Sequence, residues 1–233
     1  MASRSDTASP PQKFLMGNKF VQFILALLFP SFCVGCDTEG SVLCAACRNA
    51  IVVQRVPTRP AGRSSLSMLY AATEYREQKI ASLLIGALKY HGVKRAADHC
   101  ADILITHLCL AQFAPQKNYL VTAVPLHRKR LRERGFNQSE LIAKHIAAQY
   151  ALPYAPRILA RTIHTTPQTE VRERAKRLEN VKGAFVCYNA QTVRGKYIIL
   201  IDDVTTTGAT FEACAHALKS AGAKKIIACA VAK

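Results

Sequence analysis

The chain has 233 residues, half of them hydrophobic, which suits one domain of moderate size with a small appendage. The formal net charge is +17, and residues 119–196 hold fifteen basic against five acidic side chains. This clustering predicts a phosphate-rich partner, either pyrophosphate on a small molecule or a nucleic-acid backbone; the alternative is that the charge only aids solubility. The spacing of the nine cysteines excludes a secreted disulfide framework and indicates a reducing compartment.

The N-terminal segment combines a polar stretch with an apolar run. Residues 1–19 begin rich in Ser, Thr and Pro, and we expect a disordered leader there. Phe20 to Phe29 is almost wholly apolar and imitates a signal peptide, but it is too short to span a membrane and no small-residue cleavage site follows it. We therefore expect a packed helix without a stable membrane span and a cytoplasmic protein, with an export signal as the alternative.

Four cysteines form a C-x2-C-x7-C-x2-C pattern, and with the preceding helix they define an expected unit at residues 20–60. Two C-x2-C turns can bring four thiolates to one tetrahedral Zn²⁺ ion, and four thiolates leave no open position for water. The pattern predicts a structural zinc site, with a redox dithiol pair or an iron–sulfur centre as the alternatives. The predicted ligands are Cys33, Cys36, Cys44 and Cys47.

Strands alternate with helices over residues 66–233, and this alternation predicts an α/β domain with a parallel sheet. The expected strands are Tyr70–Tyr75, Tyr119–Val124, Tyr197–Ile201 and Ile226–Ala232, and Asn180–Phe185 leads into another. The expected helices are Lys79–Tyr90, Ala96–Phe113, Ser139–Tyr150 and Phe211–Ala221.

A basic segment follows the strand that ends before Pro125. We expect a loop, because loops at the carboxyl ends of parallel strands converge on one crevice, where several positive donors would suit pyrophosphate. Two alternatives are a solvated basic helix face and a nucleic-acid groove in which Phe136 stacks on a base. His127 is a candidate general base by position alone, the alternative being a surface or hinge histidine. The basic residues are Arg128, Lys129, Arg130, Arg132 and Arg134.

Residues 197–210 are the most informative segment of the chain. An apolar strand is followed by Asp202 and Asp203 and then by a Thr/Gly loop that opens into a helix. Backbone N–H groups and the helix dipole at such a loop favour an anion, whereas two carboxylates would repel a bare phosphate. A sugar phosphate satisfies both features, with the acids on ribose hydroxyls or Mg²⁺ and the loop on the 5′-phosphate. The alternative is an ordinary strand-turn-helix with threonine caps.

The segment resembles the signature of type I phosphoribosyltransferases, which bind phosphoribosyl pyrophosphate (PRPP). It is not a P-loop, because no Gly-Lys-Ser/Thr follows, and it lacks the three glycines of a dinucleotide fingerprint. Together with the four cysteines, several short sequence blocks elsewhere in the chain resemble those of the ComF family, and the resemblance covers roughly residues 20–233. These blocks are Leu88-Lys89-Tyr90-His91-Gly92, Val124-Pro125-Leu126-His127, Arg134-Gly135-Phe136-Asn137-Gln138, Gln168, Arg177 and Asn180-Val181.

The resemblance implies a type I phosphoribosyltransferase fold with an N-terminal zinc finger. It implies that Asp202 and Asp203 bind ribose hydroxyls or Mg²⁺, and that PRPP is also bound by Thr206, Thr207, Gly208, Ala209, Thr210 and Arg128. It further implies a role in DNA uptake during natural transformation, with single-stranded DNA and a competence helicase as partners. In phosphoribosyltransferases a mobile lid occupies the place of residues 168–180. Arg172, Arg174 and Arg177 would supply its charges, the alternative being an exposed charged helix.

Two functions remain open at this point. The chain either binds PRPP, or a related phosphoribosyl ligand, with Mg²⁺ while it handles DNA, or it transfers phosphoribose from PRPP to an acceptor in nucleotide metabolism. In the second case Asp202, Asp203 and the basic segment would act by positioning and charge stabilisation.

Overall fold

The computed structural model describes residues 30–60, 64–162 and 183–233. The expected leader, the apolar helix at 20–29 and the whole of the expected lid at 168–180 lie outside these residues. The helices described are α2 (Ala45–Asn49), α3 (Lys79–Tyr90), α4 (Ala96–Leu110), α5 (Arg128–Arg134), α6 (Gln138–Gln149), α8 (Ala190–Val193) and α9 (Ala209–Ser220). The strands are β1 (Met68–Thr73), β2 (Tyr119–Ala123), β3 (Leu159–Arg161), β4 (Phe185–Cys187), β5 (Tyr197–Val204) and β6 (Lys225–Ala232).

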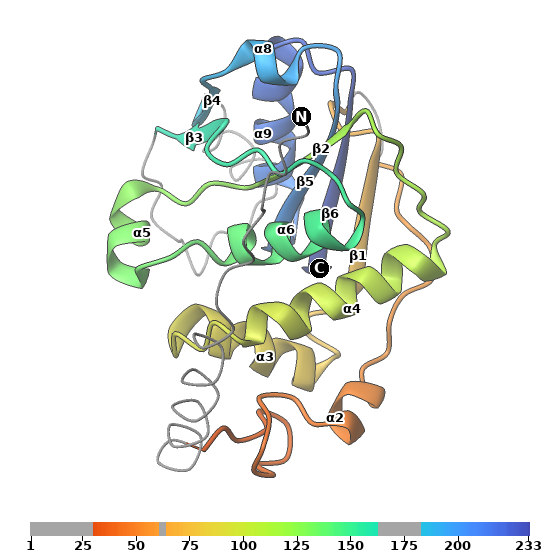
Figure 1. The fold of residues 1–233 in the computed structure, drawn as a ribbon, viewed down its shortest axis with the longest axis vertical. Coiled ribbons are helices and arrows are strands. Elements are labelled where there is room, and N and C mark those ends of the chain that lie inside the picture. The colour runs from red at the N-terminus through yellow and green to blue at the C-terminus, as the bar shows by residue number, and fades with distance from the viewer. Residues whose placement is uncertain (1–29, 61–63, 163–182) are drawn as a thin grey trace, which may run out of the picture.

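Four parallel strands form the central sheet in the order β1-β6-β5-β2 (Figure 1). The predicted α/β class with a parallel sheet flanked by helices is confirmed. The strands are almost wholly apolar because both faces of the sheet are covered. β3 and β4 form a separate antiparallel pair, so the strand expected near residue 185 does not join the main sheet.

Alternate residues of β5 enter two hydrophobic clusters, one on each face of the sheet. Ile199 and Ile201 pack with residues of α3, α4 and α6, whereas Ile198 and Leu200 pack with residues of α9 and the β3–β4 pair. The alternation continues to the carboxyl end of β5 and decides where the acidic pair lies.

The segment that holds the four cysteines (residues 33–51, the cysteine segment) shares the hydrophobic core on the α3/α4 side of the sheet. Cys33, Val42, Leu43 and Ile51 are buried in the same cluster as the apolar faces of α3 and α4. The segment lies beyond these two helices from the sheet (Figure 1). Its apolar residues therefore stabilise both the segment and the helices on which it packs.

The basic segment differs from its prediction as a loop. Residues 128–134 form α5, with His127 as the N-cap and Gly135 in the left-handed conformation at the C-cap. Arg, Lys, Leu and Glu all have good helix propensity, and the Nδ1 of His127 accepts the N–H of Lys129 at 3.2 Å. Local helix preference therefore outweighs the expectation drawn from the sheet topology.

Candidate functional site

The four predicted metal ligands lie together. Cys33 and Cys36 belong to a tight turn, while Cys44 caps α2 and Cys47 lies within it. The four sulfurs are all within 4.8 Å of one another, and the Cys36 and Cys44 sulfurs are 3.6 Å apart. Tetrahedral Zn–S bonds of ~2.3 Å would require sulfur separations of roughly 3.8 Å, so the cluster fits one zinc ion.

The protonation of the thiols also suits a cation. Burial opposes ionisation of Cys33, but backbone N–H groups directed at its sulfur outweigh burial and lower its pKa to about 6. The pKa of Cys47 is raised to about 12, first by its contact with the sulfur of Cys36 and then by burial. Four sulfurs this close together cannot ionise independently, and a divalent cation would relieve the repulsion between thiolates.

Glycine at position 35 allows the two cysteine turns to approach. A Cβ atom on Gly35 would lie 2.8 Å from the sulfur of Cys47, closer than any real contact of that kind. The absence of a side chain therefore permits the cluster to close around an ion.

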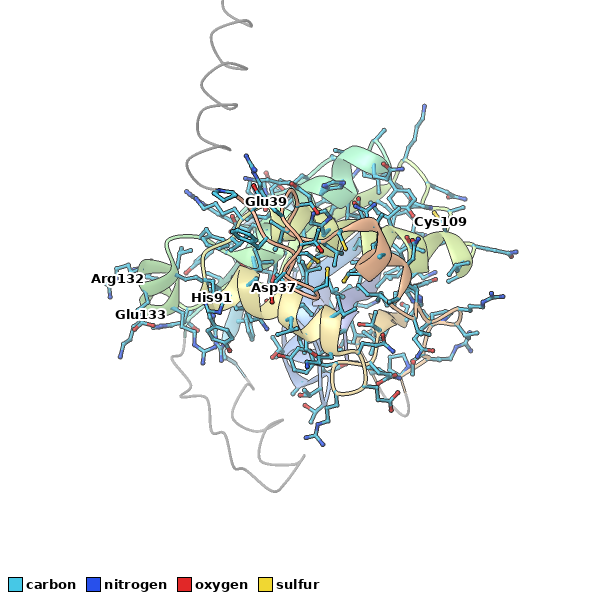
Figure 2. All side chains as sticks on the ribbon, turned by 90° about the horizontal axis from the view of Figure 1, so that it is seen from below. Asp37, Glu39, His91, Cys109, Arg132 and Glu133 are labelled. Atoms are coloured by element: carbon cyan, nitrogen blue, oxygen red, sulfur yellow. The ribbon has the colours of Figure 1, made fainter. Side chains whose placement is uncertain are left out.

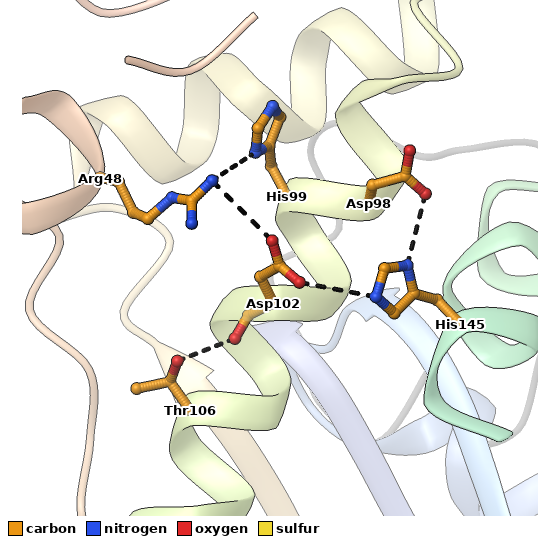
Figure 3. A network of polar contacts seen from close by, with 6 residues as sticks. All are labelled: Arg48, Asp98, His99, Asp102, Thr106 and His145. Carbon is orange, nitrogen blue, oxygen red and sulfur yellow. Dashed lines mark hydrogen bonds and ion pairs between the residues drawn. The ribbon is translucent and has the colours of Figure 1, made fainter. Parts of the chain in front are cut away.

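A network of polar contacts connects the cysteine segment to helices α4 and α6 (Figure 3). Arg48 of α2 contacts His99 at 3.2 Å and Asp102 at 3.9 Å, both on α4. His145 of α6 then bridges Asp98 and Asp102 at 3.4 and 3.5 Å. These partly exposed contacts orient α2 more than they stabilise it, because exposed ion pairs contribute only ~0–1 kcal/mol each.

The two predicted acids lie within β5 rather than after it, and their side chains diverge. Asp202 shares the face of Ile198 and Leu200, whereas Asp203 shares that of Ile199 and Ile201. The Oδ1 of Asp202 accepts the hydroxyl of Ser139 at 2.8 Å and the N–H of Asp203 at 2.9 Å. Burial and the neighbouring Asp203 nevertheless raise the pKa of Asp202 to about 7.

Asp203 is paired with a lysine that sequence reasoning left without a role. The Nζ of Lys89, in the last turn of α3, lies 2.7 Å from the Oδ1 of Asp203, and both side chains are largely buried. Burial works against the charged ammonium, but the attraction of Asp203 outweighs it and raises the pKa of Lys89. A lysine beside the apolar face of a predicted helix, three residues before Gly92, was the available signal.

The Thr/Gly loop forms the predicted entrance to a helix. Gly208 is the N-cap of α9 with a φ of 78°, a conformation that favours glycine. The N–H of Ala209 donates to the hydroxyl of Thr207 at 3.3 Å. Glu212, in the first turn, accepts the Ser64 hydroxyl and the Ser65 N–H at 2.6 and 2.7 Å. Residues 206–210 therefore stand at the positive end of a twelve-residue helix.

The basic residues of α5 separate between two cavities. Arg128 lines a cavity of about 590 Å³ beside the end of β2, with Tyr154, Arg161 and Tyr188 among its walls. Arg130 and Arg134 line a second cavity of about 650 Å³ together with residues 89–92.

Lys129 and Arg132 are exposed, unlike Arg130 and Arg134, which are partly buried. Figure 2 shows Arg132 and Glu133 at the same edge of the molecule as His91, with Cys109 at the opposite edge. The predicted cluster therefore does not act as one loop facing one pocket.

Arg161 is a second residue that sequence reasoning missed. It ends β3, lines the first cavity and lies 5.5 Å from the centroid of the Phe185 ring. Burial and then the charge of Arg130 lower its pKa, while Asp202 acts in the opposite direction. Arg161 therefore places a positive charge near Asp202 on the α9 face of the sheet. The three proposed lid arginines, by contrast, lie outside the described residues.

Comparisons with known proteins test two predictions, the phosphoribosyltransferase-type fold and the resemblance to the ComF family. Residues 137–233 match the family model described as the phosphoribosyl transferase domain. The chain is 30% identical over 147 residues to DNA utilization protein YhgH of Escherichia coli O157:H7, and 29% identical over 107 residues to competence protein F of Haemophilus influenzae. It is 31% identical over 109 residues to competence protein ComFC of Bacillus subtilis. The chain is a homologue of the ComF competence proteins.

The predicted resemblance to the ComF family is thus confirmed, and so is the phosphoribosyltransferase-type fold. The match to YhgH covers 62% of this chain and 63% of YhgH. The match to competence protein F covers 46% of each chain, and the match to ComFC covers 46% of this chain and 41% of ComFC. Among solved structures, the chain is similar to a glutamine PRPP amidotransferase from B. subtilis complexed with ADP and GMP. That similarity has 18% identity and a TM-score of 0.38, covering 58% of this chain and 26% of that one. Within the described residues, no helix combines the length and apolarity needed to cross a membrane.

Proposed function

We propose that this protein binds PRPP, or a related phosphoribosyl ligand, together with Mg²⁺, and acts in the cytoplasm in DNA uptake. The observation that carries the proposal is the arrangement at the carboxyl end of β5, where two carboxylates adjoin a Thr/Gly loop at a helix N-terminus. Residues 206–210 would hold the 5′-phosphate and Asp202 and Asp203 the ribose hydroxyls. Arg128, which lines the first cavity, would supply positive charge for pyrophosphate, whose oxygens suit Mg²⁺.

The DNA part of the proposal has separate support. Relatives of this chain are named DNA utilization and competence proteins. The second cavity combines cations with an aromatic ring: Tyr90 is 75% exposed and the Arg134 guanidinium lies 5.9 Å from its centroid. Exposed aromatic rings next to cations suit the bases and phosphates of single-stranded DNA. A helicase is the partner that the resemblance to ComF proteins adds.

One observation favours the alternative of an active phosphoribosyltransferase. The first cavity, lined by Tyr154 and Tyr188, has room for an acceptor beside Arg128 and Arg161. His127 is the candidate general base on its wall, and its Nδ1 caps α5. Catalysis would then depend on positioning and charge stabilisation by Asp202 and Asp203.

Calorimetric titration with PRPP and Mg²⁺ tests the binding function, and release of pyrophosphate from PRPP, with and without nucleobases or DNA ends, separates binder from enzyme. We expect binding with a dissociation constant in the micromolar range, which is common for substrates of this kind. Absence of binding by the folded, zinc-loaded protein would refute the proposed function.

A salt titration tests the DNA site. Affinity for a labelled oligo-dT should fall steeply with salt, and Arg130→Ala should make the slope of log K against log salt shallower by about 0.7, the value for one lost phosphate contact on a single strand. Tyr90→Ala should weaken binding by about tenfold through lost stacking and leave the slope unchanged.

Two exposed residues away from the second cavity provide matched controls. Arg76→Ala and Tyr188→Ala should leave DNA affinity near that of the wild type. A wild-type affinity that does not respond to salt, or equal losses in the control variants, would rule out this DNA site.

A further inference from the structure

The ion pair between Lys89 and Asp203 bears on how the acidic pair can be used. The ammonium is 2.7 Å from the carboxylate, and 19% and 8% of the two side chains are exposed. The pair lies against α4, where the fully buried thiol of Cys100 is close enough for both charges to affect its pKa. Lys89 is therefore packed in place and is not a solvated side chain that contacts Asp203 by chance.

The position of Lys89 is supported from its own helix as well. It is the basic residue in the last turn of α3, where the negative end of the helix dipole favours a cation. The preceding residue, Leu88, is fully buried in the core beneath the sheet. The packing of α3 against the core thus places one positive charge next to the acidic pair.

A direct Mg²⁺ ligand role fits these two carboxylates poorly. Magnesium requires near-octahedral oxygen ligands at about 2.1 Å and gives up its waters reluctantly. At Asp203 such an ion would lie close to the ammonium of Lys89. At Asp202 the Oδ1 atom already accepts a hydroxyl and an N–H, which leaves Oδ2 as a single protein ligand for an ion that needs six.

Hydroxyl ligands fit the same atoms better. Each carboxylate offers about four lone-pair positions, so the contacts to Oδ1 leave acceptor capacity for a sugar hydroxyl. A hydroxyl is neutral and adds no repulsion to the ammonium.

We propose that Lys89 is the resident cation of the acidic pair, so that Asp202 and Asp203 accept the ribose hydroxyls without a divalent ion bound to them. Mg²⁺ then enters only with the pyrophosphate group of PRPP. This inference rests on the proposed function, and it predicts which part of the ligand needs the metal. Ribose 5-phosphate, which carries no pyrophosphate, should bind without Mg²⁺.

The probes are ribose 5-phosphate and PRPP, titrated calorimetrically into the zinc-loaded protein. For ribose 5-phosphate, the dissociation constants of the wild type in the absence of divalent ions and in millimolar Mg²⁺ should agree within about twofold. Divalent ions are removed by dialysis, which avoids a chelator that would compete for zinc. PRPP should bind at least about tenfold more tightly with Mg²⁺ than without it, because only PRPP carries the group that binds the metal.

Three variants separate a charge role for Lys89 from a packing role. Lys89→Met should weaken ribose 5-phosphate at least about tenfold without Mg²⁺ and regain part of the loss when Mg²⁺ is added, since the ion can then approach the unpaired acids. Lys89→Arg should bind ribose 5-phosphate equally well with and without Mg²⁺, like the wild type. Lys79→Met, at the exposed opposite end of α3, is the control and should change nothing.

The outcomes distinguish the two proposals. A wild type that fails to bind PRPP with Mg²⁺ refutes the proposed function. A wild type that binds PRPP, but binds ribose 5-phosphate only with Mg²⁺ or not at all, refutes the role of Lys89 alone. Thermal unfolding checks that each variant is folded. If Lys89→Met does not fold, the role of Lys89 is tested by whether the wild type and Lys89→Arg bind ribose 5-phosphate equally well with and without Mg²⁺.

Discussion

Replacement of Asp202 and Asp203 by asparagine is expected to weaken PRPP binding at least about 100-fold. A hydrogen bond to a charged acceptor contributes ~1.5–3 kcal/mol, and two such bonds to ribose hydroxyls would be weakened together. The measurement is a calorimetric titration with PRPP and Mg²⁺ at pH 8. At that pH Asp202 is mostly ionised, since its pKa is raised to about 7.

The single variants show where the loss arises. Asp202→Asn leaves the Lys89–Asp203 pair intact and should lose at least about tenfold in affinity, one bond's share of the energy. Asp203→Asn leaves the buried Lys89 without its counter-charge, so its thermal stability should fall as well. A control with Glu77→Gln and Asp98→Asn removes two negative charges at exposed positions and should bind PRPP normally. Unchanged PRPP affinity in the folded Asp202/Asp203 variant would show that the ligand is bound elsewhere.

The pH dependence gives a further check on Asp202. An ionised carboxylate is the better acceptor for a hydroxyl, so wild-type affinity should rise between pH 6 and pH 8 as Asp202 loses its proton. Asp202→Asn cannot titrate, and any rise that it retains belongs to the ligand's own phosphate or to other groups. The difference between the two profiles therefore reports on Asp202.

Loss of zinc is the second large effect that we expect. Wild-type protein should contain about one equivalent of Zn²⁺, and Cys36→Ser should lose nearly all of it, because a closed tetrahedral site needs all four thiolates. Elemental analysis of the purified proteins measures the zinc. Thermal unfolding should show a clear drop in midpoint, since structural zinc binding contributes folding energy directly.

Cys109→Ser is the matched control for this prediction. Cys36 and Cys109 are both exposed, so neither substitution creates a core cavity, and only Cys36 belongs to the cluster. Cys109→Ser should therefore retain zinc and wild-type stability. Iron in place of zinc, or an equal metal content in the two variants, would overturn the assignment.

Local pattern was enough to predict the elements that carry the site. α3 has the predicted bounds, and the bounds of β2, α6, α9 and β6 differ from prediction by only one or two residues. The apolar period of helices and the continuous apolar runs of buried strands are local signals, so neighbouring residues suffice to detect them. The four cysteines were equally predictable, because the spacing within each C-x2-C turn nearly determines its geometry.

The basic segment shows where such reasoning fails. Residues 128–134 were predicted as a loop that delivers five cations to one crevice, but they form a helix that places them in different surroundings. Arg128 and Arg130 line different cavities, and Arg132 is exposed. A loop and a short helix have similar composition here, so only the three-dimensional course of the chain decides which cations converge.

The sequence by itself determined the phosphoribosyltransferase-type segment, the cysteine cluster and the kinship with ComF proteins, since each depends on residues a few positions apart. Only the tertiary structure decided the partners of the acidic pair. Ser139 and Lys89 are distant from Asp202 and Asp203 in sequence and reach them through the packing of α6 and α3 against the sheet. The two-residue period of β5 directs the adjacent acids to opposite faces of the sheet, yet α6 and α3, which supply their partners, both pack on the Ile199 side, so only the tertiary packing decides each contact.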